Sequence, residues 1–258
     1  MNDSKRFSLA VLVFAGLFGL WAGASAMGLV SPFLLPSPLD VWKGFVGLVG
    51  NGKLADHTGI SILRVLMGYA LAIVLALALS LMMAASRVFA ALADPPLEFL
   101  RQIPPLALMP LIMLWLGIGE AQKVGIIVLA CFFPVFLGFR GGFAQVDPRL
   151  IEVGHAAGFP RRELLRRIAL PAALPAIVIG LRLGLGHGWR ALVGAELIAS
   201  SAGLGYMILD AQDLARTDIV MVGILVIGAI GLATDAGLKA LVRWRMPWIR
   251  QDLELGNG

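Results

Sequence analysis

Six apolar stretches, separated by short polar segments, account for most of the chain. A helix needs about 20 apolar residues to cross a hydrocarbon core of about 30 Å. All six reach that length, and they run 8–30, 60–84, 97–118, 124–143, 172–200 and 219–241. The chain is 59% hydrophobic and 14% charged, against about 45–50% apolar and about 25% charged residues in soluble domains. The sequence therefore predicts an all-α membrane protein with six transmembrane helices.

The first stretch has two interpretations. Lys5 and Arg6 precede it and the small residues 24–26 resemble a cleavage site, as in a secretory signal peptide. However, it stays apolar for more than 20 residues, longer than the 7–15 that are typical of a signal peptide. We favour an uncleaved N-terminal transmembrane helix over residues 1–30.

Basic residues indicate the orientation, because lysine and arginine collect in cytoplasmic segments. The segments assigned to one side hold Lys5, Arg6, Arg87, Arg140, Arg149, Arg161, Arg162, Arg166, Arg167, Lys239, Arg243, Arg245 and Arg250. Those on the other side hold only Lys43, Lys53, Lys123 and Arg216. We therefore expect both termini in the cytoplasm. The net charge of +5 is a topology signal, so we expect no nucleic-acid partner.

The loop over residues 144–171 has its own predicted structure. Asp147 can cap a helix that begins at Pro148, since proline suits the first helical position. Gly158 can end that helix with a positive φ, and Pro160 can start a second one. A helix-turn-helix with Phe159 in its turn is a compact projection that a soluble partner can bind. The alternative is a solvated basic loop that only follows the topology rules.

The spacing of residues in this loop resembles the EAA-G-I-LP signature of the membrane-spanning subunits of ABC importers. Six positions match: Glu152, Ala157, Gly158, Ile168, Leu170 and Pro171. Val153 and Gly154 depart from it, because the signature prefers alanine there. The resemblance implies that the loop docks on a separate ATPase. The ATPase-coupling residues it implies are those six together with Ala156, Phe159 and Arg162.

Further motifs narrow the family. They are residues 35–38, Ser61, Arg64, Gly68, residues 98–101, 104–108 and 115–120, and residues 180–182, Trp189 and Glu196. Together they are similar to the permeases of the nitrate, sulfonate, taurine and bicarbonate importers, from about residue 35 to 248. The resemblance implies a type I ABC importer permease fold, a dimer with a second copy, two ATPase subunits and a periplasmic binding protein in a bacterial inner membrane. A sulfonate or similar small anion is the expected solute.

The chain lacks a glycine-rich P-loop with a lysine followed by serine or threonine. We therefore expect a permease that is not itself an enzyme and binds no cofactor, with ATP and magnesium on the partner ATPase. The main alternative is an ATP-independent secondary transporter or channel, which would couple through intramembrane acids. A membrane enzyme is less favoured, because no catalytic grouping or metal-ligand set stands out in the spans, and Cys131 is the only cysteine.

Ionisable residues inside spans usually face a bundle interior or an aqueous cavity. Four lie in the fifth stretch and are candidates for the translocation path: Arg182, His187, Arg190 and Glu196. Arg64 and Arg101 are interpreted as structural groups that hold helices together. A structural role is favoured for Arg182 and Glu196 too, whereas solute contact and a structural role remain equal for His187 and Arg190.

Glycines 180, 184 and 188 recur every four residues in the fifth stretch, which favours close contact with another helix and a central position. The five prolines between 95 and 110 predict a kink in the third stretch, either a moving hinge or a static bend. Residues 31–59 are expected to form a periplasmic interfacial segment with a helix starting at Pro38. Residues 60–246 are then the core permease domain of five helices, and 247–258 a cytoplasmic tail.

Overall fold

The computed structural model describes residues 3–246, and this part of the chain is helical, without strands. The helices are α1 Asp3–Ala26, α2 Pro38–Gly50, α3 Lys53–Ala85, α4 Arg87–Leu100, α5 Met109–Leu116, α6 Glu120–Ala144, α7 Pro148–Ala156, α8 Arg161–Leu164, α9 Leu170–Ala199, α10 Leu204–Asp213 and α11 Thr217–Arg245. A 3₁₀ turn, Pro105–Leu108, precedes α5, and a π turn, Leu165–Ala169, joins α8 to α9. The predicted tail 247–258 lies outside the described residues.

Four helices of the described part are long and apolar enough to cross a membrane. They are α3, α6, α9 as continued from α8, and α11, so the second, fourth, fifth and sixth predicted spans are confirmed. The first stretch is helical only as far as Ala26, and its apolar segment Val11–Ala26 is shorter than the others. All six stretches therefore form helices, and α1 has 24 residues.

The third stretch, predicted over 97–118 with a kink at its prolines, is sharply bent in the structure. Its helix α4 already begins at Arg87, and the chain then turns by 90° into the segment Pro105–Leu116. Pro104 follows the end of α4, and proline disfavours helical geometry in the residue before it. Pro95 and Pro96 lie within α4 and do not end it. Taken together as one span, the bent pair raises the number of membrane-length helices in the described part of the chain from four to five.

The centre of the bundle is the contact between α6 and α9, which confirms the central place predicted for the fifth stretch. A Cβ atom added to Gly180 would lie 2.6 Å from the Cα of Gly138. One added to Gly188 would lie 2.6 Å from the Sγ of Cys131. No side chain fits between the backbones, so the glycine stripe sets the distance between the two helices. Helix α3 packs beside both through Val65 and Ala72.

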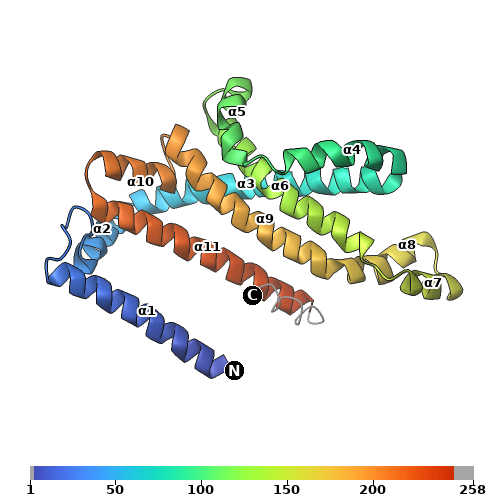
Figure 1. Cartoon of the computed structure of the whole chain (residues 1–258), viewed down its shortest axis with the longest axis horizontal. Coiled ribbons are helices and arrows are strands. Elements are labelled where there is room, and N and C mark those ends of the chain that lie inside the picture. Colours follow the sequence, from blue (N-terminus) through green and yellow to red (C-terminus); the bar gives the residue numbers. More distant parts are fainter. Residues whose placement is uncertain (1–2, 247–258) are drawn as a thin grey trace.

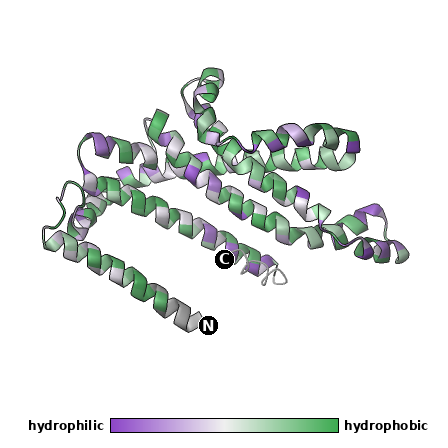
Figure 2. Ribbon diagram, viewed as in Figure 1, coloured by the Kyte–Doolittle hydropathy of each residue, from purple (hydrophilic) through white to green (hydrophobic). Residues whose placement is uncertain are grey.

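The two ends of the bundle differ in composition. Helices α2 and α10 lie together at one end, and α7 and α8 project beyond the other end of α9 (Figure 1). Apolar residues line the long helices, whereas hydrophilic residues gather on α7 and α8 (Figure 2). Helix α2 begins as predicted, with the Ser37 hydroxyl accepting a hydrogen bond from the Asp40 amide at 3.1 Å. Helix α3 begins at Lys53, inside the predicted interfacial segment 31–59.

Candidate functional site

The projecting hairpin of α7 and α8 forms as the sequence predicts. The Asp147 side chain accepts a hydrogen bond from the Arg149 amide at 2.9 Å and caps α7. Gly158 follows α7 with φ +76°, a conformation in which other residues are strained. The Phe159 amide then donates to the Gly154 carbonyl at 3.0 Å and closes the turn. Caps and a glycine turn therefore fix the path of this segment locally.

Packing inside the hairpin explains one departure from the signature. Gly154 is buried, and a Cβ atom there would collide with the ends of the Leu164 and Ile168 side chains. The two large side chains occupy the space that alanine would need. The guanidinium carbon of Arg167 lies 5.5 Å from the centre of the Phe159 ring, close enough for a cation–π interaction. Glu163 and Arg167 form an ion pair, with nitrogen and oxygen 3.6 Å apart.

The predicted coupling residues separate into an exposed set and a supporting set. Exposed are Glu152, Ala156, Ala157, Gly158, Arg162 and Leu170, whereas Phe159, Ile168 and Pro171 are half-buried. Val153, next to Glu152, is 65% exposed although it is apolar. Apart from Leu170, which begins α9, the exposed set consists of small and charged groups on the hairpin, and Phe159 and Ile168 of the second set pack against Gly154 of α7. Contact of either set with an ATPase stays a prediction.

Glu196 lies in a buried network at the opposite end of the bundle. Its side chain is fully buried and forms an ion pair with Arg64 at 2.8 Å. It also accepts hydrogen bonds from the Ser61 hydroxyl and from the Gly205 amide, both at 2.8 Å. These partners come from α3 and α10, so one carboxylate joins α9 to two other helices. This geometry supports the structural role favoured for Arg64 and Glu196.

The same network reaches α6 through Glu120. Arg64 Nη2 lies 2.5 Å from a Glu120 carboxylate oxygen, and Lys123 Nζ lies 2.8 Å from the same oxygen. Lys123 is only 3% exposed, so it is a buried partner of Glu120. Arg101, by contrast, pairs with Glu98 on its own segment at 3.2 Å. This ion pair is local and does not join two helices.

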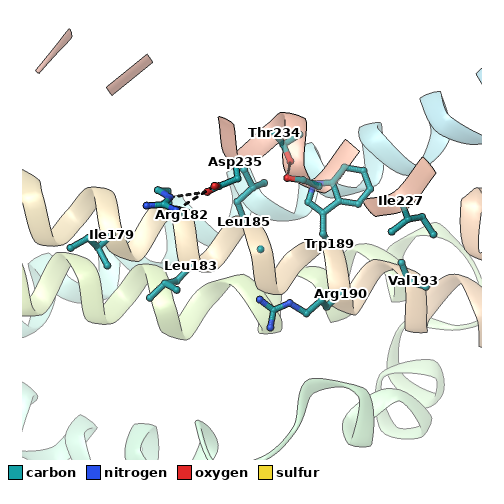
Figure 3. A pocket seen from close by; sticks show the side chains of 12 residues that line it. Ile179, Arg182, Leu183, Leu185, Trp189, Arg190, Val193, Ile227, Thr234 and Asp235 are labelled. Atoms are coloured by element: carbon teal, nitrogen blue, oxygen red, sulfur yellow. Dashed lines mark hydrogen bonds and ion pairs between the residues drawn. The ribbon is translucent and has the colours of Figure 1, made fainter. Parts of the chain in front are cut away.

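A cavity of about 660 Å³ lies between α9 and α11. Arg182, Trp189 and Arg190 line it from α9, and Thr234 and Asp235 line it from α11 (Figure 3). The guanidinium of Arg182 donates to Asp235 at 2.8 Å. Of the predicted path residues, two therefore meet at this cavity. His187 is exposed on α9 but is not part of the cavity wall, and Glu196 lies apart in its own network.

Sequence reasoning missed Asp235. It is an acid inside the sixth apolar stretch. A position inside an apolar stretch is the signal that identified the other ionisable residues, so the same signal could have found Asp235. Its carboxylate also accepts from Lys239, with nitrogen and oxygen 2.9 Å apart. The cavity thus contains an ion pair between α9 and α11, formed by Arg182 and Asp235. It also contains Arg190, which lies within the fifth apolar stretch.

Known proteins resemble this chain over most of its length. The family model described as "Binding-protein-dependent transport system inner membrane component" matches residues 68–246. The permease protein SsuC of Bacillus subtilis (strain 168), named for aliphatic sulfonates, is 37% identical over 238 residues, which are 92% of this chain and 86% of that protein. The taurine transport system permease protein TauC of Escherichia coli (strain K12) is 36% identical over 250 residues, 95% of this chain and 91% of that protein.

A solved structure described as an amino acid ABC transporter with histidines shares the fold. It aligns with a TM-score of 0.59 at 17% sequence identity, covering 78% of this chain and 96% of that one. The chain in a structure of the MetNI methionine ABC transporter, in an inward-facing conformation, aligns with a TM-score of 0.52 at 16% identity and covers 70% of this chain. These likenesses support the all-helical permease fold that the sequence predicted.

Proposed function

The chain belongs to the binding-protein-dependent transport system inner membrane components, the permease subunits of ABC importers, and we propose that two copies of it form the solute path of an ATP-driven importer. Two ATPase subunits on the cytoplasmic side bind ATP and magnesium and supply the energy. A periplasmic binding protein delivers the solute, a sulfonate or a similar small anion. The complex lies in a bacterial inner membrane with both termini of this chain in the cytoplasm.

The observation that carries this proposal is the α7–α8 hairpin. It projects beyond the membrane-spanning helices, its turn is fixed by Gly158, and its apolar contacts are internal (Figure 1). A rigid projection can transmit the movement of a bound ATPase to α9, since the π turn leads from α8 directly into that helix. Closure of the ATPases around ATP then turns the two bundles and moves the cavity from one side to the other.

The ion pairs argue against the secondary-transporter alternative. A transporter driven by an ion gradient needs an intramembrane acid that can exchange its cation. Glu196 is fully buried against Arg64, and Asp235 is shared by Arg182 and Lys239. Both acids are held by arginine partners from other helices. Coupling through the cytoplasmic hairpin does not require either acid to change its charge.

The experiment measures solute-stimulated ATP hydrolysis by the full complex in proteoliposomes. We expect Glu152→Lys to abolish stimulation, because it reverses the charge on the exposed face of the hairpin. Gly158→Pro should do the same, since proline cannot adopt the positive φ at this turn. Both variants should still reach the membrane. Glu98→Lys changes an exposed charge on α4 and is the control that should retain stimulation. Normal stimulation in both hairpin variants would refute the coupling role.

A further inference from the structure

The first turn of α10 is capped by side chains from other helices. A helix begins with backbone amides that have no partner inside the helix, and these amides need acceptors from elsewhere. The amides of residues 203–205 donate, in order, to Nδ1 of His57 at 3.1 Å, to the Ser61 hydroxyl at 2.9 Å and to a Glu196 carboxylate oxygen at 2.8 Å. Side chains of α3 and α9 therefore fix the start of α10.

Of these three capping groups, His57 is the one that can change its charge near neutral pH. A neutral imidazole has one nitrogen that accepts a hydrogen bond and one that carries hydrogen. Since Nδ1 of His57 accepts from the Gly203 amide, it carries no hydrogen in this structure. A histidine side chain ordinarily gains a second proton at about pH 6.5. The Ser61 hydroxyl does not ionise in this range, and Glu196 is fully buried in its ion pair with Arg64.

Protonation of His57 would remove this cap in two ways. Nδ1 would gain a hydrogen and could no longer accept from the Gly203 amide. The new positive charge would also lie at the N-terminus of α10, where the helix dipole is positive. The contacts of Ser61 and Glu196 do not depend on His57, and Arg64 still donates to the Ala202 carbonyl at 2.6 Å. The loss is therefore confined to the first turn of α10 and leaves the bundle folded.

His57 lies in the wall of a cleft that is open to water. The cleft has a volume of about 820 Å³, is lined by α2, α3, α10 and α11, and lies at the end of the bundle opposite the α7–α8 hairpin (Figure 1). The His57 ring is half-buried, 6.0 Å from the Tyr206 ring of α10. Helix α3 has 33 residues and is thus about 50 Å long, longer than a hydrocarbon core of about 30 Å. Its first turns, which contain His57, therefore sense the pH of the outer medium in the proposed orientation.

The other ionisable groups around His57 titrate in different pH ranges. Those in the wall of the same cleft come from every segment that lines it: Asp40, Lys43, Lys53, Asp56, Tyr206, Asp210, Arg216 and Asp218. Arg216 and Asp218 pair with each other at 2.8 Å. Aspartates ordinarily ionise at about pH 4, whereas tyrosine, lysine and arginine titrate at about pH 10 or above. A change in the cleft between about pH 5.5 and about pH 7.5 is therefore expected to come from His57.

We propose that His57 is a pH-sensitive cap of α10, which loosens the first turn of this helix when the outer medium becomes acidic and so slows import. The effect on import rests on the proposed function, whereas the change in α10 does not. Leu204 and Met207 of α10 pack in one apolar cluster with residues of α2 and α11, so this helix shapes the outer cleft. A loosened cleft must be ordered again when a binding protein delivers solute there, and this ordering opposes binding.

The first experiment measures hydrogen–deuterium exchange of residues 200–213 in the permease–ATPase complex in nanodiscs, without ATP. The test variant is His57→Asn, because the asparagine side-chain oxygen can replace Nδ1 as acceptor and does not titrate. We expect equal exchange in the variant and the wild type at about pH 7.5, where His57 is neutral. At about pH 5.5 the wild type should exchange about three- to tenfold faster, as expected for the loss of one helix cap. His187→Asn, at an exposed position of α9, is the matched control that should behave as the wild type.

Asp210→Asn is a second variant that retains His57. It removes an exposed acid from the same cleft, and a nearby acid favours a protonated histidine. The acid transition of α10 should therefore move to lower pH in Asp210→Asn, which decides the question if His57→Asn does not assemble. An unchanged transition would count against His57 as the titrating group.

The second experiment measures import into proteoliposomes that contain ATP, with the binding protein outside and the interior held at about pH 7.5. Acidification of the outer medium to about pH 5.5 should slow the wild type about threefold or more relative to His57→Asn. Equal exchange of residues 200–213 in the wild type and His57→Asn at the acidic pH would overturn the cap. Faster exchange in the wild type without slower import would overturn the regulatory role. Because the exchange measurement involves no transport, its result is distinct from failure of the coupling proposal.

Discussion

Glu196→Gln tests the buried network that joins α3, α6, α9 and α10. The substitution leaves Arg64, which is 2% exposed, with only one carboxylate partner, Glu120. It also removes an acceptor from the Gly205 amide or the Ser61 hydroxyl. Loss of one partner from a buried ion pair costs about 3–5 kcal/mol. Since glutamine keeps one oxygen that can accept, we expect a loss of about 3 kcal/mol, at the lower end of that range.

The free energy converts to a measurable shift in unfolding temperature. For 150–250 residues, about 1 kcal/mol corresponds to about 2–4 °C, so Glu196→Gln should unfold about 6–12 °C below the wild type. Cys131 is the only cysteine and is fully buried, so a thiol-reactive dye reports unfolding of this chain when the other subunits lack cysteine.

Glu98→Gln is the control, because the Glu98–Arg101 pair is exposed and such pairs contribute about 0–1 kcal/mol. Equal unfolding temperatures for Glu196→Gln and Glu98→Gln would show that the network does not stabilise the bundle.

Three glycine substitutions test the packing. Gly180→Ala should destabilise the α6–α9 contact by about 1–3 kcal/mol, measured by the same thiol assay, whereas Gly228→Ala, with no atom within 4 Å of its added Cβ, should be neutral. Gly154→Val should push α7 away from Leu164 and reduce solute-stimulated ATP hydrolysis. His155→Val, at the exposed neighbouring position, should reduce this activity less. Equal activities of the two variants would contradict the prediction. Gly203→Ala should lower the unfolding temperature more than Gly52→Ala, because both have positive φ but only the Gly203 Cβ would collide with Glu196.

Sequence patterns predicted the elements that depend on local chemistry. Hydropathy located α3, α6, α9 and α11, since burial in lipid requires long apolar runs. Capping residues located α2 and α7, because Ser37 and Asp147 act on amides two or three residues away. The glycine stripe predicted the close contact of α9, as its spacing of four residues places the glycines on one face.

The features that the sequence did not predict depend on contacts between distant segments. The 90° turn after α4 could not be located, because five prolines lie between residues 95 and 110 and only one break occurs among them. The partners of Arg182 and Arg64 lie 53 and 132 residues away along the chain, so spacing carries no signal for them. The cavity likewise exists only because α9 and α11 lie side by side (Figure 3).

Crosslinking from the α7–α8 hairpin tests the central claim most directly. Val153→Cys, in a Cys131→Ser background, places one reactive thiol on the exposed face of α7, where Val153 is 65% exposed. In the assembled complex we predict a crosslink from this thiol to the ATPase that changes when ATP is added. Leu214→Cys, 67% exposed beyond the end of α10, should give no such crosslink. Import of solute by a complex in which Val153→Cys never crosslinks to the ATPase would contradict the account.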